Sequence, residues 1–157
     1  MSKVLEFGDY EEPMATMLYP AADIEVRPLK GEWWWVDKKE KYDGIYVFYS
    51  ANKIPFTIEQ QVFDNWAEAL NPGAILHVVV PSFEYLCRMA LQPKIIMWVK
   101  AMILNATNHY TMPQLRILMH RAGLSVMKAK TGEGAIHLYQ QDIVLEQHYV
   151  AAINEDS

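Results

Sequence analysis

The sequence of 157 residues predicts an α/β fold with a mostly parallel sheet, helices on both faces and a C-terminal antiparallel hairpin. Residues 44–49 and 75–80 are apolar almost throughout, as expected for strands buried on both faces of a parallel sheet. A helical apolar pattern between them completes a strand–helix–strand unit, which is nearly always right-handed. Residues 124–130 and 135–140 flank a Gly-containing turn and indicate the hairpin.

The chain is expected to open with a strand at residues 3–7, which ends at Gly8. A short helix-like segment over 13–19 follows, and then another strand candidate at 23–26. These two strand candidates precede the central strand–helix–strand unit and are expected to extend its sheet.

The helix of the central unit is expected to begin at Thr57, because Thr57 and Gln60 have the spacing of a capping box. In such a box each of the two side chains satisfies a free backbone N–H of the first turn. Residues 71–73 (Asn-Pro-Gly) are expected to end this helix. Thr111 and Gln114 form a second capping box and predict another helix.

Two further helices are expected between the strand at 75–80 and the second capping box. The first spans residues 83–91, and Pro93 separates it from the second. The second, over 95–103, is apolar nearly all round and is therefore either buried or partly an oligomer surface. For residues 142–152 the pattern favours a strand over a helix.

Composition narrows the classes of function. We expect one domain over residues 1–153, followed by a short acidic tail over 154–157. The net charge of −5 argues against nucleic-acid binding, because that binding needs clustered cations. No apolar run reaches the roughly 18 residues that span a membrane, and no secretion signal is visible, so a cytoplasmic protein is expected. The histidines lack metal-ligand spacing.

Four stretches resemble the class I S-adenosylmethionine-dependent methyltransferase family, and within it the small methyltransferases of bacteria and their viruses. Residues 42–46 (YDGIY) are similar to the family's fourth strand, and 62–73 (VFDNWAEALNPG) to its helix and Pro-Gly turn. Residues 75–82 (ILHVVVPS) resemble its fifth strand, and 108–124 its H-x-x-x-T and A-G-F helix. The resemblance covers roughly half of the chain. It implies a reduced Rossmann-like fold, S-adenosylmethionine as cofactor and methyl transfer to an unidentified acceptor.

Residues 4–8 (VLEFG) resemble the opening of the family's cofactor motif, but residues 9–13 (DYEEP) lack its further glycines. Those glycines let the backbone approach the cofactor without a Cβ in the way. The resemblance places Glu6, Gly8 and Asp9 at the cofactor. It does the same for the two polar residues that follow the fourth strand, Ser50 and Asn52. The degenerate loop supports an alternative, a catalytically inactive methyltransferase fold that serves as a structural or interaction subunit.

The segment between the first and fourth strands is short. Only the 34 residues 9–42 lie there, whereas one strand–crossover–strand unit takes about 30. The family has two further units in this place, so at least one is reduced or missing. The strand at 23–26 is either the family's second or its third. If it is the second, the resemblance implies that Asp23 or Glu25 binds the ribose hydroxyls.

His109 and Tyr110 are the catalytic candidates, because they precede a helix cap in a loop expected over the carboxyl ends of the strands. A histidine there can act as a general base, or it can simply bond to the backbone. His77, inside an apolar strand, is interpreted as a core residue with its hydrogen bonds satisfied.

Three consecutive tryptophans cannot all face the same way, so at least one is expected at the surface. They are Trp33, Trp34 and Trp35. Together with the helix at 95–103 they predict a contact with a protein partner or a second copy of the chain.

Overall fold

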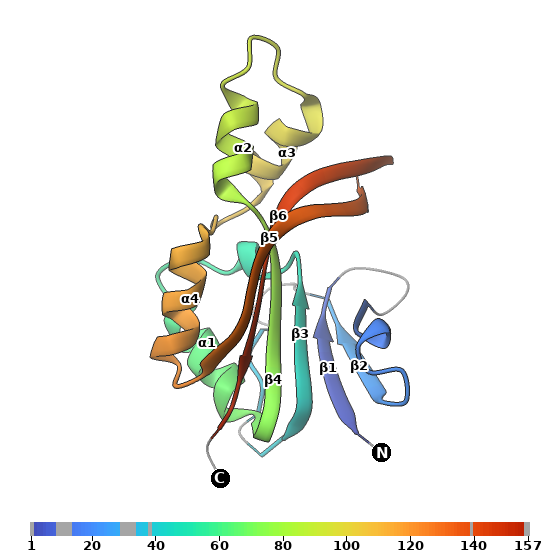
Figure 1. Ribbon diagram of the computed structural model, residues 1–157, viewed down its shortest axis with the longest axis vertical. Coiled ribbons are helices and arrows are strands. Elements are labelled where there is room, and N and C mark those ends of the chain that lie inside the picture. Colours follow the sequence, from blue (N-terminus) through green and yellow to red (C-terminus); the bar gives the residue numbers. More distant parts are fainter. Residues whose placement is uncertain (1, 9–13, 29–33, 38, 139, 156–157) are drawn as a thin grey trace.

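The computed structural model describes residues 2–8, 14–28, 34–37, 39–138 and 140–155 and shows a single six-stranded sheet (Figure 1). The strands are β1 (Lys3–Phe7), β2 (Asp23–Arg27), β3 (Tyr42–Phe48), β4 (Leu70–Pro81), β5 (Ser125–Leu138) and β6 (Gln141–Ile153). The α-helices are α1 (Glu59–Glu68), α2 (Phe83–Ala90), α3 (Met97–Asn105) and α4 (Met112–Arg121). Two short 3-10 helices, η1 (Met14–Met17) and η2 (Ala51–Lys53), complete the described elements.

The strand order is β2-β1-β3-β4-β6-β5. The first four strands are parallel, and β6 runs antiparallel to both β4 and β5. The predicted α/β class, with a mostly parallel sheet and a C-terminal antiparallel hairpin, is therefore confirmed. The position of the hairpin was wrong: residues 125–138 form the single strand β5, and its hairpin partner is β6. The expected turn at residues 131–134 does not form, because these residues pair with residues 145–148 of β6 and continue the strand. Residues 142–152 lie in β6, as the pattern favoured.

Helices α1 and α4 cover one face of the sheet and bury most of the core there. Trp66 of α1 is fully buried and stacks on Phe7 of β1, with 5.3 Å between ring centroids. Its indole Nε1 donates a hydrogen bond to the Trp34 carbonyl at 2.7 Å. The side chain therefore joins the helix, the sheet and the segment that leads into β3.

The opposite face of the sheet is covered more sparsely, although the sequence predicted helices on both faces. Beside β1 it carries η1, and at the far end of the hairpin α2 and α3 pack against β5 and β6 (Figure 1). Val99 and Met102 of α3 are buried there, whereas Ile96 and Met97 are 43% and 73% exposed. The apolar segment 95–103 is thus divided between core and surface.

The capping box expected at Thr57 does not form. Helix α1 begins at Glu59, and its N-cap, Ile58, makes no side-chain capping bond. Gln60 instead reaches α4, where its Nε2 donates to the Leu118 carbonyl at 3.2 Å. The turn at residues 71–73 also lies inside β4, because this strand begins at Leu70.

The capping box at Thr111 is confirmed. The Gln114 N–H donates to Thr111 Oγ1 at 3.3 Å, and the Thr111 N–H donates to Gln114 Oε1 at 3.1 Å. We expect Thr111→Ala to lower the free energy of unfolding by about 1 kcal/mol, since the start of the helix loses its cap. Thr57→Ala is the matched control and is expected to change it by less than about 0.5 kcal/mol. Urea denaturation measures both; equal losses would contradict the assignment.

The tryptophan segment is described only in part, since Trp33 lies outside the described residues. Trp34 is buried at 9% exposure, whereas Trp35 is 38% exposed. No helix in the described part of the chain has the length and apolar character needed to cross a bilayer.

Candidate functional site

The topology places a switch point between β1 and β3. From β1 the chain moves outward to β2 and then returns past β1 to form β3 and β4. In open α/β sheets ligands bind outside the carboxyl ends of the strands at such a point. Gly8 ends β1 there, and Tyr49 and Ser50 follow β3. The candidate site is therefore this carboxyl edge.

Ser50 holds the ends of β1 and β3 together. Its side chain is 2% exposed, and Oγ lies 2.9 Å from the Phe48 carbonyl and 3.2 Å from the Phe7 carbonyl. A hydroxyl has one hydrogen, so it donates to one of these carbonyls at a time. The residue expected to touch the cofactor thus fixes the spacing of the two strands that flank the switch point.

Tyr49 adopts a left-handed backbone conformation, with a φ of 49°. Residues other than glycine rarely do so, and such strain is found most often at functional sites. The Tyr49 hydroxyl donates to Oε1 of Gln147 in β6 at 2.6 Å, and its ring stacks on Phe48. The strained turn after β3 is therefore tied to the antiparallel part of the sheet.

Gly8 lies at the carboxyl edge directly after β1, and Glu6 is the penultimate residue of that strand, where its carboxylate has a structural role. Glu6 is fully buried, and its Oε1 accepts a hydrogen bond from the Ala15 N–H of η1 at 2.5 Å. The buried Gly8 donates its N–H to the Arg27 carbonyl at 3.0 Å. Asp9, the third residue of this set, lies outside the described residues.

The strand β2 takes the place of the second strand in the doubly wound order, directly beside β1. The third strand, which that order puts outside the second, has no counterpart among the strands that the structure describes. Of the two positions that the sequence left open for the strand at 23–26, the structure therefore gives it that of the second strand.

Neither acidic residue of β2 lies at the carboxyl edge. Asp23 begins the strand and pairs with Lys3, so it lies at the amino end. Glu25, in mid-strand, accepts a hydrogen bond from the Tyr42 hydroxyl at 2.6 Å and pairs with Arg27 at 3.2 Å. Arg27 itself ends β2 and also bonds Glu40 at 3.1 Å. Sequence reasoning missed Arg27, although as the last strand residue before a proline it could have been placed at this edge.

Asn52 retains unused hydrogen-bonding capacity. Its backbone carbonyl accepts from the N–H groups of Thr107 and Asn108, at 3.0 and 2.9 Å, which docks the loop before α4 onto η2. Its Oδ1 is buried and accepts no hydrogen bond from any residue that the structure describes. A buried acceptor without a donor is costly, so this atom would be stabilised by any donor that reaches it.

The two catalytic candidates have different environments. His109 is half-buried, stacks on Phe83 at 5.2 Å between centroids, and has Nε2 3.2 Å from the Ile103 carbonyl. Tyr110 is 1% exposed, and its hydroxyl donates to the Ala51 carbonyl at 3.2 Å. Burial and the nearby Glu59 carboxylate raise the pKa of the Tyr110 hydroxyl far above its usual range. The Tyr110 hydroxyl is thus engaged with the backbone of η2, and its catalytic role stays a prediction.

A hydrogen-bonded triad centred on the buried His77, on the sparsely covered face, was not foreseen. His77 Nε2 lies 2.7 Å from the Tyr19 hydroxyl, and its Nδ1 lies 2.6 Å from the Tyr149 hydroxyl. His77 is 6% exposed with both ring nitrogens paired, which agrees with its interpretation as a satisfied core residue. Burial lowers the pKa of the His77 imidazole to about 4.

This shift predicts a pH-dependent stability. The unfolded chain protonates His77 near its ordinary pKa of about 6.5, and the folded chain only near 4, so stability falls as the pH drops through this interval. Between pH of about 7.5 and about 5.0 the loss is expected to be about 2 kcal/mol. In His77→Gln this part of the pH dependence should vanish. Urea denaturation at both pH values checks it; an unchanged pH dependence in the variant would refute the assignment.

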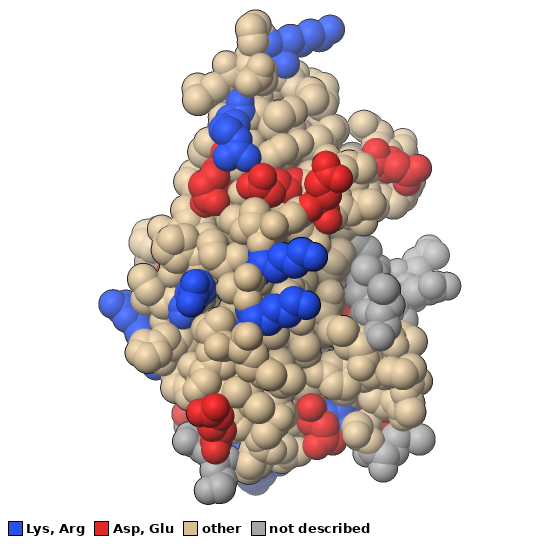
Figure 2. All heavy atoms as spheres, viewed as in Figure 1, with Lys and Arg blue, Asp and Glu red and all other residues tan. Residues whose placement is uncertain are grey.

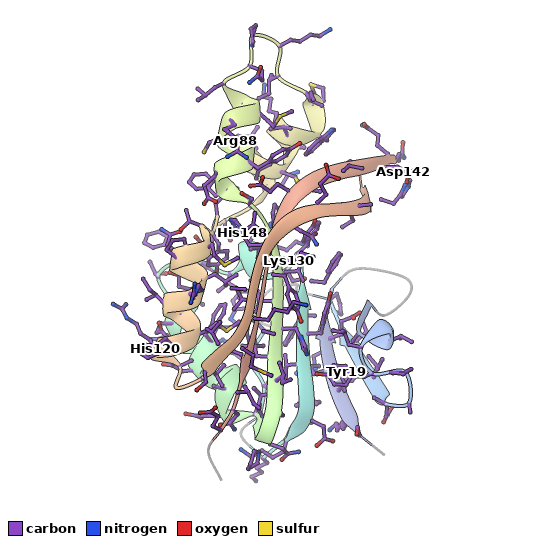
Figure 3. All side chains as sticks on the ribbon, in the orientation of Figure 1. Tyr19, Arg88, His120, Lys130, Asp142 and His148 are labelled. Atoms are coloured by element: carbon purple, nitrogen blue, oxygen red, sulfur yellow. The ribbon has the colours of Figure 1, made fainter. Side chains whose placement is uncertain are left out.

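The part of the chain that the structure describes contains no group of three or more His, Cys, Asp or Glu side chains arranged to hold a metal ion. In His148, both ring nitrogens are engaged by other side chains. It is 1% exposed, with Nδ1 2.7 Å from Thr131 Oγ1 and Nε2 2.9 Å from Glu84 Oε2 (Figure 3). Its contacts join α2 to the hairpin.

No family model matches the sequence, and no curated protein matches it significantly. Solved structures do match the fold. A Bacillus halodurans protein assigned as a methyltransferase superposes with a TM-score of 0.66 at 8% identity, covering 99% of this chain and 93% of that one. An S-adenosylmethionine-dependent methyltransferase of Thermotoga maritima superposes with a TM-score of 0.64 at 17% identity, covering 98% of this chain and 82% of that one. The N-methyltransferase NodS of Bradyrhizobium japonicum, in complex with S-adenosylhomocysteine, superposes with a TM-score of 0.58 at 13% identity, covering 99% of this chain and 79% of that one.

Proposed function

Because the chain has the class I methyltransferase fold, we propose that it binds S-adenosylmethionine at the carboxyl ends of β1 and β3 and transfers the methyl group to an acceptor. The observation that carries this proposal is the switch point, where Gly8 follows β1 and Ser50 and Asn52 follow the adjacent strand β3. The complex of NodS with S-adenosylhomocysteine supports it, since a protein of this fold takes the demethylated cofactor.

The residues at the edge offer a partner for an amino group of such a cofactor but none for its ribose hydroxyls. The free Oδ1 of Asn52 would accept a hydrogen bond from an amino group, and the buried Gly8 leaves the end of β1 without a side chain. Ser50 and the left-handed Tyr49 would hold the two strand ends in place. The ribose hydroxyls would find no carboxylate from β2, because Asp23 lies at the opposite end of that strand.

When bound, S-adenosylmethionine supplies an electrophilic methyl group on a sulfonium. The chain would contribute positioning, exclusion of water and a proton acceptor. His109 suits the last role: when Nε2 donates its hydrogen to the Ile103 carbonyl, Nδ1 keeps its lone pair. The contact with Phe83 would hold the ring in orientation.

A second candidate, a catalytically inactive fold that serves as an interaction subunit, is favoured by a different observation. Leu91, Met97 and Leu104 of the α2–α3 region are 84%, 73% and 69% exposed, and these helices protrude beyond the end of the sheet (Figure 1). Met97 and Leu104 are seven residues apart on α3 and so share one side of that helix, and exposed apolar groups that share a surface are typical of contact sites. This candidate predicts self-association or partner binding without any binding of S-adenosylmethionine, and Met97→Glu should weaken the association.

Thermal unfolding with added S-adenosylmethionine, S-adenosylhomocysteine or ATP separates the two candidates. A ligand at about 100 times its Kd stabilises the folded state by about 2.7 kcal/mol, which for a chain of this length raises Tm by about 5–10 °C. We expect this rise with the two sulfur ligands and not with ATP, which shares the adenosine. No shift with either sulfur ligand at millimolar concentration would reject the methyltransferase and leave the interaction subunit.

A further inference from the structure

A cavity of about 200 Å³ opens on the sparsely covered face of the sheet, opposite α1 and α4. Strands β3, β4, β5 and β6 form its walls, so it rests on the rigid part of the fold. The residues used below are Tyr46, Lys128, Lys130, Glu133, Gln147 and Tyr149. The cavity is distinct from the carboxyl edge at the switch point, although the Tyr49–Gln147 hydrogen bond connects the two.

The charge of the cavity is positive. Lys128 and Lys130 are two residues apart on β5 and therefore project from the same side of the strand. Glu133 is the one carboxylate among its lining residues. Figure 2 shows two Lys or Arg side chains next to each other over the middle of this face, below a row of Asp and Glu side chains, at the height where Figure 3 labels Lys130.

Aromatic groups form the deeper part of the cavity. Tyr46 is 8% exposed, and Tyr149 is half-buried beside it. Lys128 Nζ lies 5.9 Å from the centroid of the Tyr149 ring, so a cation and an aromatic face are presented together. A flat ring placed here would contact aromatic surface while its acidic group lay near the ammonium groups.

The Tyr149 hydroxyl can also serve as a donor. His77 is neutral, so one of its ring nitrogens donates and the other accepts. If Nδ1 donates to Tyr149, the Tyr149 hydroxyl keeps its own hydrogen for a ligand, and Tyr19 donates to Nε2. An anion in the cavity would favour this arrangement, and the buried triad would respond to its binding.

We propose that this cavity binds a small planar carboxylate built on a single aromatic ring. Its volume corresponds to about seven water molecules, which suits a ligand of about nine heavy atoms. Lys128 and Lys130 pair with the carboxylate, and Tyr149 supplies ring contact and a hydroxyl donor. This site stands on the cavity alone and does not depend on methyl transfer.

Benzoate is the probe, and NMR signals of the His77 imidazole and the Tyr149 ring are the readout. Saturable shifts with a millimolar Kd are expected for so small a ligand, and benzyl alcohol should bind at least about tenfold more weakly. Lys128→Gln with Lys130→Gln should weaken benzoate binding about tenfold. The control, Lys39→Gln with Lys100→Gln, removes the same charge from exposed positions elsewhere and should leave the Kd unchanged.

Three results would overturn the proposal: no saturable shift up to about 50 mM benzoate, equal affinity for benzyl alcohol, or an unchanged Kd in the Lys128/Lys130 variant. Tyr149→Phe keeps the ring and removes the hydroxyl. It is expected to weaken benzoate about fivefold, because a hydrogen bond to a charged group is lost. If Tyr149→Phe weakened benzyl alcohol equally, the Tyr149 hydroxyl would not bind the carboxylate, and that part of the proposal would be wrong.

Discussion

Gly8→Val is expected to weaken the binding of S-adenosylhomocysteine by about 30-fold or more. Gly8 is buried at the end of β1, and its N–H bond to the Arg27 carbonyl fixes the backbone there. An added side chain would occupy the edge between β1 and β3, and overpacking a confined site costs about 1–3 kcal/mol. The loss of affinity is expected because the cofactor is placed at this edge. Calorimetric titration with S-adenosylhomocysteine measures it.

Two controls make this experiment decisive. Gly132→Val adds the same side chain in β5, where an added Cβ meets only Lys130 Cε at 3.7 Å, and it should leave the affinity unchanged. Gly8→Ala is the milder substitution if valine disturbs folding, and its melting without ligand reports the fold separately. If folded Gly8→Val binds as tightly as the parent chain, the cofactor does not lie at the end of β1.

The largest expected loss of stability is at Trp66. Trp66→Ala should lower the free energy of unfolding by about 4 kcal/mol, because a fully buried indole is replaced by a cavity. It also loses the stacking on Phe7 and leaves the Trp34 carbonyl without its donor. Total stabilities are about 5–15 kcal/mol, so this single change brings the chain close to unfolding.

Trp35→Ala is the matched control for Trp66. Trp35 is 38% exposed, and its loss should cost less than about 1 kcal/mol. Trp66→Phe keeps a ring and removes the hydrogen bond, and an intermediate cost of about 1–2 kcal/mol is expected. Urea denaturation gives all three values; similar costs at positions 66 and 35 would refute the assignment of Trp66 to the core.

Local patterns predicted the centre of the fold well. The apolar runs of β3 and β4 could be recognised because strands buried on both faces have few polar residues, and Thr111 has both partners of its cap within four residues. The start of α1 could not be predicted the same way. Gln60 is drawn to a carbonyl 58 residues away in α4, and such a tertiary contact leaves no local signal.

The site was predictable in part, and its limits have a physical cause. Gly8 and Ser50 could be placed at the carboxyl edge because they come one and two residues after the ends of β1 and β3, and Glu6 is the penultimate residue of β1. Asp23 did not, since the direction of β2 puts its first residue at the other edge. In the Tyr19–His77–Tyr149 triad the partners of His77 are 58 and 72 positions away. The pairing of β4 with β6 brings His77 and Tyr149 together, and the segment after η1 supplies Tyr19.

The central claim is that S-adenosylmethionine binds where the chain switches direction, between β1 and β3. A structure of the chain crystallised with S-adenosylhomocysteine tests it most directly. We expect the ligand against Gly8 and η2, with one of its amino groups donating to Oδ1 of Asn52. Density for the ligand elsewhere, or a chain that stays ligand-free at concentrations that saturate other proteins of this fold, would contradict the claim.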